Sequence, residues 1–209
     1  MPYYPKLKIL FIHIPKTGGT VIENEIKKIT YQRLYSGKCN DLLPSPNNKI
    51  SLQHQPYEIL YKYRSICFRS LYIFNKIKMF TIVRNPYDRV ISDLFFLKKI
   101  KKETSAEDVY IIIKNDYIFR KDLDNHNLPQ YKFITDKNNE IVKNIKIFRT
   151  ENLNRDNEIL NKYLGININI IRDDANKDYS KYFCKESRKL IADHYRKDFE
   201  LFNYDTFGF

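Results

Sequence analysis

Residues 9–20 read Ile9-Leu10-Phe11-Ile12-His13-Ile14-Pro15-Lys16-Thr17-Gly18-Gly19-Thr20, and this stretch decides the fold. Its first part is a continuous apolar run inside a strand predicted from Leu7 to Ile14, and such runs are typical of strands covered on both faces in a parallel sheet. A polar loop, Pro15–Gly19, follows at once. From Thr20 onward, apolar residues recur at helical spacing, at Val21, Ile22, Ile26 and Ile29. Strand, glycine loop and helix in this order indicate the opening unit of an α/β nucleotide-binding fold.

The loop has the composition of an anion site. Gly18 and Gly19, two of only five glycines in the chain, lie side by side at the predicted helix N-terminus. Glycines allow a tight turn and bring backbone N–H groups close to an anion, and the helix dipole adds positive potential. Lys16 adds a full charge, and Thr17 and Thr20 add hydroxyl donors. The alternative is an ordinary tight turn, but a turn requires neither the lysine nor the threonines.

The loop differs from the standard P-loop of nucleoside triphosphatases. That motif places its lysine after the glycines, whereas Lys16 precedes Gly18, and no upstream glycine completes the pattern. A nucleotide kinase or an enzyme that hydrolyses ATP or GTP is therefore disfavoured.

A second polar block follows another apolar run. Residues 78–83 are predicted to form a strand, after which Asn85 is a good N-cap and Pro86 a good first residue of a helix that runs to about Lys101. Arg84 at the strand end and Ser92, two helical turns further on, form a phosphate clamp in this interpretation. A surface ion pair is the alternative for Arg84 alone.

The remaining pattern favours one α/β domain over residues 1–209, with a central parallel sheet flanked by helices. No internal repeat, low-complexity linker or composition break divides the chain. Helices are predicted at 56–63, 106–114, 153–164 and 185–202, a surface loop at 37–48, and a third strand at 145–148.

The net charge of +12 at pH 7 indicates an anionic partner such as nucleic acid, a membrane surface, an acidic glycan or a nucleotide. A lysine-rich solvated surface is the alternative. Cys39, Cys67 and Cys184 suggest neither a disulfide framework nor a zinc site, and no His, Cys or carboxylate cluster has metal-ligand spacing, so we expect no metal. Without a signal-like segment or an apolar run of eighteen residues, we expect a cytoplasmic or otherwise soluble protein.

His13-Ile-Pro-Lys-Thr-Gly-Gly-Thr20 closely resembles the 5′-phosphosulfate loop of carbohydrate sulfotransferases that use PAPS (3′-phosphoadenosine 5′-phosphosulfate), the group that includes the heparan sulfate 2-O- and 6-O-enzymes. The block Phe80-Thr-Ile-Val-Arg84-Asn-Pro-Tyr-Asp-Arg89-Val-Ile-Ser92 is similar to the second motif of that family. The resemblance implies a P-loop-like sulfotransferase fold. It also implies that Pro15, Lys16, Thr17, Gly18, Gly19 and Thr20 bind the phosphosulfate, and that Arg84 and Ser92 bind the 3′-phosphate.

Weaker similarities extend over nearly the whole chain. His126-Asn-Leu-Pro129-Gln130 resembles a family segment that is usually followed by a strand and a turn containing a glutamate, here near residues 148–153. The ending Tyr195-x-x-Asp198-x-x-x-Phe202-x-Tyr204 is similar to the family's last helix. The animal members usually carry a membrane anchor and disulfides, which this sequence does not display, so a proteoglycan acceptor is not implied.

Transfer of a sulfuryl group to a hydroxyl requires a base, and a neutral histidine suits that role. We predict His54, because Gln53-His-Gln-Pro-Tyr-Glu-Ile-Leu60 resembles the segment around the catalytic histidine of the 6-O-type enzymes; a helix-capping or solvent-exposed histidine is the alternative. Glu23 and Glu58 are reserve bases. Among the other histidines, His13 and His194 are expected to be structural, and His126 to lie in a polar loop, either exposed or near the ligands.

Lys16 is predicted to be catalytic as well as binding, because a cation beside the bridging oxygen stabilises charge on the leaving phosphate. The predicted function is transfer of a sulfuryl group from PAPS to a hydroxyl, of a carbohydrate by preference, with PAP as the product. The alternative is a basic module on the same fold that binds a polyanionic glycan or nucleic acid without catalysis, although nucleic acid is not the expected partner.

Overall fold

The computed structural model describes residues 1–35, 42–68, 74–171 and 177–206, and its centre is a four-stranded sheet of order β1-β2-β3-β4. β2 (Ile9–Ile12), β3 (Lys78–Val83) and β4 (Ile145–Arg149) run parallel, whereas the short edge strand β1 (Tyr3–Tyr4) pairs antiparallel with β2. The predicted α/β fold with parallel strands is confirmed. The sheet is mixed rather than purely parallel, because β1, which was not predicted, folds back against β2.

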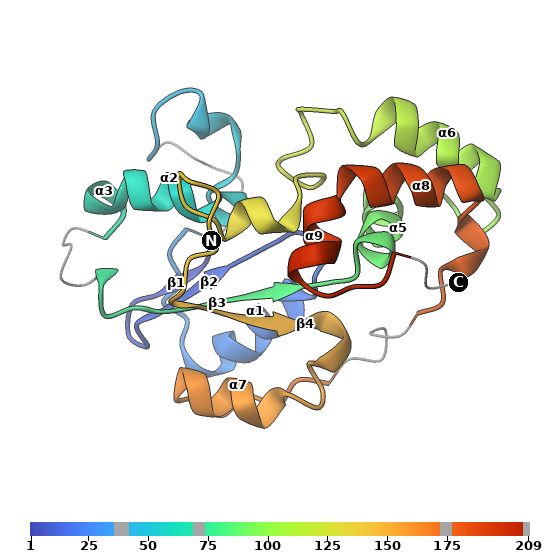
Figure 1. Cartoon of the computed structure of the whole chain (residues 1–209). Coiled ribbons are helices and arrows are strands. Elements are labelled where there is room, and N and C mark those ends of the chain that lie inside the picture. Colours follow the sequence, from blue (N-terminus) through green and yellow to red (C-terminus); the bar gives the residue numbers. More distant parts are fainter. Residues whose placement is uncertain (36–41, 69–73, 172–176, 207–209) are drawn as a thin grey trace.

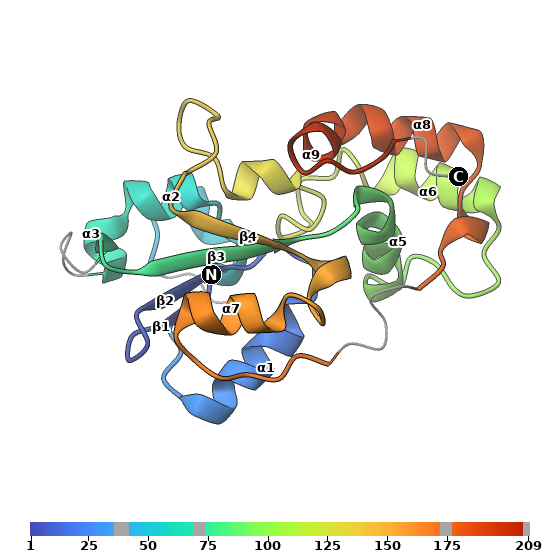
Figure 2. The same cartoon turned by 60° about the horizontal axis from the view of Figure 1, so that its bottom comes forward.

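Helices cover both faces of the sheet (Figure 1, Figure 2). α1 (Gly19–Ile29) and α7 (Asn157–Leu164) lie on one face, and α2 (Tyr57–Lys62) and α3 (Arg64–Phe68) on the other. Alternate strand residues face the two sides: Ile9 and Phe11 belong to the cluster under α1 and α7, and Leu10 and Ile12 to the cluster under α2 and α3. Each such buried side chain contributes roughly 1.5–3 kcal/mol of stability.

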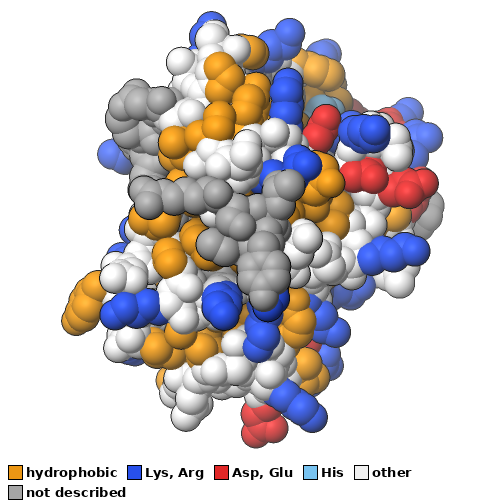
Figure 3. Space-filling model, turned by 90° about the vertical axis from the view of Figure 1, so that its left-hand side faces the viewer, with side chains coloured by type: hydrophobic (Ala, Val, Ile, Leu, Met, Phe, Trp, Pro, Cys, Tyr) orange, Lys and Arg blue, Asp and Glu red, His pale blue; other side chains and the backbone are white. Residues whose placement is uncertain are grey.

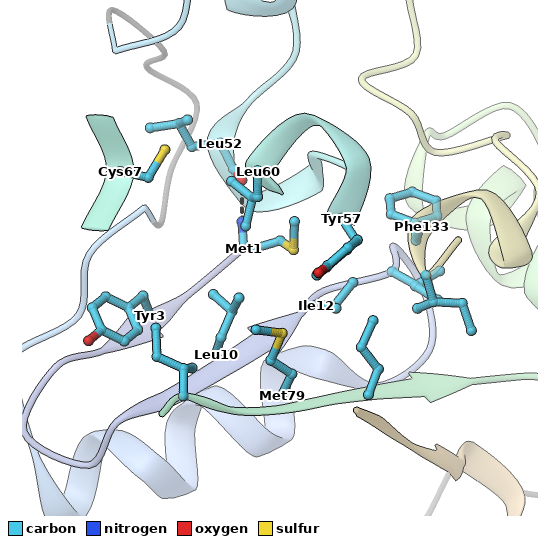
Figure 4. Packing of buried hydrophobic residues seen from close by; sticks show 14 of the residues in the cluster. Met1, Tyr3, Leu10, Ile12, Leu52, Tyr57, Leu60, Cys67, Met79 and Phe133 are labelled. Carbon is cyan, nitrogen blue, oxygen red and sulfur yellow. Dashed lines mark hydrogen bonds between the residues drawn. The ribbon is translucent and has the colours of Figure 1, made fainter. Parts of the chain in front are cut away.

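The cluster beneath α2 begins at the first residue of the sequence. Figure 4 shows Leu10 and Met79 projecting from their strands toward Met1, Leu60 and Tyr57. Met1 is fully buried, and its amino group donates to the carbonyl of Leu52. The segment that precedes α2 is therefore anchored to the sheet, and this segment includes His54.

A group of helices lies beyond the carboxyl end of β3 (Figure 1). It consists of α5 (Pro86–Phe96), α6 (Ala106–Asp116), α8 (Lys185–His194) and α9 (Arg196–Leu201), which share a third hydrophobic cluster around Val90, Leu94, Ile113 and Ile191. The carboxyl ends of β2 and β3 thus lie at the border between the sheet and this group of helices. In the described part of the chain, no helix is long and apolar enough to cross a membrane.

Several predicted helix limits are wrong. α5 ends at Phe96 rather than near Lys101, because Lys98 turns into the left-handed region with φ 56° and ends the helical bonding. The predicted helix 185–202 is two helices that meet at Tyr195. The break lies where Tyr195 donates to the carbonyl of Asn127 and Asp198 accepts from the amides that follow Pro129, so tertiary hydrogen bonds set the bend.

Shorter irregular elements complete the connections. The 3₁₀ turns are Asn47–Lys49, Leu52–His54, Gln130–Phe133, Thr150–Asn152 and Ser180–Tyr182. The predicted start of α7 at Leu153 is also wrong, because residues 153–156 form turns. The helix begins at Asn157 and ends, as predicted, at Leu164, where Gly165 with φ 73° is its C-cap. Residues 37–41 of the predicted loop 37–48, Cys39 among them, lie outside the described residues. Cys67 and Cys184 are free cysteines.

Candidate active site

The loop of residues 15–19 leaves the carboxyl end of β2 and enters α1, as the sequence predicts. Both glycines are required by geometry. Gly18 has φ 92°, a left-handed conformation that residues with a side chain rarely adopt. Gly19 has no room for a side chain, because a Cβ atom there would stand 2.5 Å from Nε2 of His13. The glycine pair therefore allows the loop to fold tightly over His13.

His13 is buried beneath the loop, in line with the structural role expected for it. Its Nδ1 lies 2.7 Å from Oε1 of Glu23, whose other oxygen accepts from Arg33. Burial opposes ionisation of Glu23, but the hydrogen bond from His13 and the charges of His13 and Arg33 hold its pKa below the ordinary value. Both oxygens of this carboxylate are thus occupied by His13 and Arg33, which disfavours Glu23 as the base.

The two threonines of the loop are placed differently. Thr17 is fully buried, and its hydroxyl donates to the carbonyl of Ile14 at 2.9 Å, while its own carbonyl accepts from Thr150 at 2.7 Å. Thr20 is exposed and faces a cavity at the loop. Thr17 thus holds the loop in shape, and of the two side chains only that of Thr20 lines the cavity.

Arg84 follows β3, and the predicted cap of α5 is confirmed, since Asn85 Oδ1 accepts from the amide of Tyr87 at 2.9 Å. The Arg84 side chain is buried, with only 2% of the residue exposed. Its Nη1 donates to the carbonyl of Lys16 at 3.3 Å. Nε and Nη2 are buried and have no hydrogen-bond partner among the described residues. Buried donors of this kind need a partner, and an anion such as phosphate fits two adjacent guanidinium nitrogens.

One cavity of about 560 Å³ brings most of the predicted site residues together. Its lining includes Pro15, Lys16, Gly18, Gly19, Thr20, His54, Arg84 and Ser92. Of the predicted residues, Thr17 is not part of this lining, for the reason given above. The reserve base Glu58 lines a different cavity, with Tyr57 and Tyr61, and is not brought to the loop.

His54 ends a 3₁₀ turn and is 5% exposed. Its Nδ1 lies 2.7 Å from Oδ2 of Asp124. Burial, with a smaller contribution from the neighbouring His13 and His126, lowers the pKa of His54 to about 4, although Asp124 opposes the shift. The imidazole is consequently neutral at neutral pH and able to accept a proton.

His126 is buried, not exposed on a loop. Its Nδ1 lies 2.7 Å from Oδ1 of Asp93, whose other oxygen accepts from Tyr117 at 2.8 Å. Its ring stacks on Phe96 with centroids 5.3 Å apart and meets the ring of His54 edge-on at 5.0 Å. Two imidazoles, each beside a carboxylate, therefore line the same cavity as the loop.

The comparisons decide which chemistry this arrangement serves. A family model described as the sulfotransferase family matches residues 3–205, nearly the whole chain. The chain belongs to the sulfotransferase family. No curated protein and no solved structure is significantly similar to it. The family predicted from the two motifs is confirmed, and family membership makes this chain an enzyme of sulfuryl transfer.

The sulfotransferase has a second cavity, of about 610 Å³, which shares Lys16, Ser92 and Phe96 with the first. Apart from Asp178, its other lining residues are basic or aromatic: Phe95, Lys102, Lys177, Lys181, Tyr179 and Tyr182. No sequence motif singles them out. The only signal was the alternation of lysine and tyrosine over residues 177–182, which a lysine-rich chain repeats elsewhere.

Arg89 is a further residue that sequence reasoning passed over. It is 1% exposed, and its guanidinium donates to three carbonyls, those of Pro15 at 3.0 Å, His126 at 2.6 Å and Leu128 at 2.9 Å. It joins the sulfotransferase loop to the segment that carries His126. Its position inside the second motif was visible, but its partners lie 37 to 74 residues away.

Folding also creates a cluster that linear spacing could not reveal. Among the described residues, His54, Asp124 and His126 offer metal-ligand atoms within 4.8 Å of one another. However, His54 is hydrogen-bonded to Asp124, and His126 to Asp93, so a metal ion would compete with the first of these bonds. The absence of a metal cofactor stays a prediction.

Proposed function

We propose that this enzyme transfers the sulfuryl group of PAPS to a hydroxyl of an acceptor, by preference a carbohydrate. The observation that carries the proposal is the buried guanidinium of Arg84, with two unpartnered nitrogens, in one cavity with the glycine loop and Ser92. A nucleotide with phosphate groups at both ends matches two anion sites that are this close. Backbone N–H groups of the loop would hold the 5′-phosphosulfate, and Arg84 with Ser92 the 3′-phosphate.

The second cavity supports a nucleoside between these two ends. Lys102, Lys177 and Lys181 give it positive potential, and Tyr179 and Tyr182 offer faces on which a base can stack. Tyr179 lies near the Arg84 guanidinium, 5.8 Å from its ring centroid to Cζ. Since Ser92 lines both cavities, the two are continuous, and one nucleotide extends from the loop into the basic cavity.

PAPS supplies an activated sulfuryl group, and the protein's own residues provide the base and the electrostatics. His54, neutral and buried, accepts the proton of the acceptor hydroxyl as the new bond between oxygen and sulfur forms and the bond between sulfur and the phosphate oxygen breaks. Lys16 stabilises the charge left on the phosphate of PAP. Its ammonium lies 4.1 Å from the ring centroid of Phe96, which directs it along the cavity wall shared by both pockets.

The cavity that holds His54 offers both polar and apolar groups to an acceptor. Gln53 and His126 line it beside Phe96, Leu97 and Leu123, so hydroxyl groups that enter there meet hydrogen-bonding partners. Hydroxyl-rich saccharides suit such a surface.

A basic module that only binds polyanions is less well supported. On the face shown in Figure 3, lysine and arginine side chains are scattered among hydrophobic ones rather than gathered in a stripe. A buried pair of His54 and Asp124 inside a cavity also has no function in surface binding of a polymer.

Two measurements test the proposal. Isothermal titration should give one saturable, stoichiometric site for PAP, and a transfer assay with radiolabelled PAPS should label at least one acceptor in a panel of glycans and small alcohols. His54→Ala should abolish transfer with PAP affinity retained, whereas Glu58→Gln, outside the cavity, should leave both unchanged. Absence of a stoichiometric PAP site would sink the proposal and favour the binding module. PAP binding without transfer to any acceptor would leave only the cofactor half of the proposal.

A further inference from the structure

We propose that Asp124 is the positioning residue of His54: its carboxylate holds the proton of His54 on Nδ1 and directs Nε2, as the base, into the cavity. The inference rests on the proposed function, since it assigns a partner to the proposed base. Nothing in the sequence motifs points to Asp124, which lies 70 residues from His54.

Asp124 is hydrogen-bonded to both ends of the segment 51–54, which carries His54. Its Oδ1 accepts from the backbone amide of Ser51 at 2.7 Å, and its Oδ2 accepts from the Ser51 hydroxyl at 2.7 Å and contacts His54 Nδ1 at 2.7 Å. The next residue, Asn125, donates from its side chain to the carbonyl of His54 at 3.0 Å. His54 is thus fixed from both its ring and its backbone.

The backbone at this point is in a rare conformation. Asp124 has φ 49° and Asn125 has φ 62°, in the left-handed region that non-glycine residues seldom occupy. Aspartate and asparagine tolerate that region better than other residues with side chains, and it persists only where the surroundings enforce it. Here the enforced turn directs one carboxylate and one amide at the same four-residue segment, 51–54.

The chemistry of the carboxylate fixes the tautomer. Burial opposes the charge of Asp124, but the hydrogen bonds from His54 and Ser51 outweigh it and lower its pKa to about 2. An ionised carboxylate only accepts hydrogen bonds, so the imidazole nitrogen that faces it must carry the proton. The lone pair then resides on Nε2. When Nε2 takes the acceptor's proton, the negative charge of Asp124 stabilises the imidazolium of His54. This matters because the rings of His13 and His126 lie close by, and a positive charge on either would disfavour that imidazolium.

Asp124→Asn tests this directly, because the amide keeps the size but can present its NH₂ to Nδ1 and favour the wrong tautomer. In the Ser-His-Asp proteases the equivalent change lowers kcat about 10⁴-fold. We expect a loss in kcat on the order of 10²-fold or more, with PAP affinity within about twofold of the unchanged protein. Asp108→Asn is the matched control: this exposed aspartate also accepts from a serine, Ser105 at 2.8 Å, but it lies at the start of α6 and does not line the cavity. It should leave kcat unchanged.

Two further variants distinguish the positioning role of Asp124 from a merely structural one. Ser51→Ala removes one hydrogen bond to the carboxylate but leaves the contact with His54, so it should cost much less than Asp124→Asn. In the double variant His54→Ala/Asp124→Asn, the second change should cause no additional loss, because residues that act as a unit are not additive. Additive losses, or a Ser51→Ala defect as large as that of Asp124→Asn, would overturn the positioning role.

Nitrogen-15 NMR of labelled histidine gives a readout that does not depend on activity. His54 should show the Nδ1–H tautomer in the unchanged protein and shift toward Nε2–H in Asp124→Asn. An unchanged tautomer would contradict the inference. The proposed base and its proposed partner are tested separately. If His54→Ala keeps full activity, the proposed base is wrong. If His54→Ala is inactive and Asp124→Asn is fully active, His54 remains the base and only the role of Asp124 is rejected.

Discussion

The guanidinium of Arg84 donates from Nη1 to the backbone carbonyl of Lys16 at 3.3 Å, so the two sequence motifs of this sulfotransferase meet in a hydrogen bond. The residues lie 68 positions apart, at the carboxyl ends of the neighbouring parallel strands β2 and β3. Lys16 itself has φ 67°, a left-handed backbone that turns its carbonyl toward Arg84. The proposed 5′- and 3′-anion sites are therefore in direct contact, and we expect a substitution at one of them to lower the affinity for the nucleotide at the other.

Arg84→Lys should weaken PAP binding, because lysine keeps the charge but cannot offer two adjacent nitrogens. We expect a loss of about 10- to 100-fold in affinity, the range of a charge-assisted hydrogen bond or two. Adenosine 5′-phosphosulfate, which lacks the 3′-phosphate, should lose much less. Isothermal titration with both nucleotides measures this, with Arg155→Lys, an exposed arginine paired with Asp156, as the control. Equal losses for the two nucleotides would place the 3′-phosphate elsewhere.

Lys16→Ala should lower turnover far more than nucleotide affinity. The ammonium is proposed to interact with charge that develops on the leaving phosphate, so its removal raises the barrier of the chemical step, by about 10²- to 10³-fold in kcat. PAP affinity should fall less than about tenfold, since the backbone N–H groups of the loop remain. Steady-state kinetics and PAP titration of this variant, with the exposed Lys27→Ala as control, check the split. A loss of equal size in both quantities, or in neither, contradicts a catalytic role.

The features that the sequence predicts correctly are those that depend on residues close together in the chain. The apolar run before the loop, the paired glycines and the Asn85-Pro86 start of α5 each depend on neighbours within a few residues, and all three are confirmed. The antiparallel strand at Tyr3 and Tyr4 was missed, because two residues are too few to show a period.

The parts of the candidate site that could not be predicted depend on distant pairings. Asp124 is one of several aspartates in a polar loop, and only the fold brings it to His54. Arg89 reads as a surface residue of an amphipathic helix, yet it is buried against three carbonyls. The bend at Tyr195 has the same origin, since helical periodicity continues through it while hydrogen bonds to residues 127–131 redirect the chain.

Acid should destabilise the fold through His54. Its pKa is about 4 in the folded chain, against an ordinary value near 6.5 when unfolded, so the unfolded chain binds more protons between these values. The free energy of unfolding should therefore fall as the pH is lowered from about 6.5 to 4, and His54→Gln should show less of this fall. Denaturant unfolding of both proteins at pH 4.5 and pH 7 gives the difference. An identical pH dependence in the two would mean that His54 titrates normally.

Gly19→Ala should distort the loop, and a second change should relieve it. The new Cβ would stand 2.5 Å from Nε2 and 2.7 Å from Cδ2 of His13, closer than non-bonded atoms approach, and His13 is held in place by its pairing with Glu23 and by stacking on Phe11. Overpacking of this kind costs about 1–3 kcal/mol, so thermal unfolding should shift downward and PAP affinity should fall with it.

His13→Ala/Gly19→Ala removes the ring that the methyl group would strike. If the clash is the cause, the double variant should bind PAP more tightly than Gly19→Ala alone, even though His13→Ala by itself gives up the contact with Glu23. That reversal is the sign of a steric conflict between two specific groups, because two independent defects would add instead. A double variant that binds PAP more weakly than either single variant would show that Gly19 is required for its backbone approach to the phosphosulfate rather than for the space that His13 occupies.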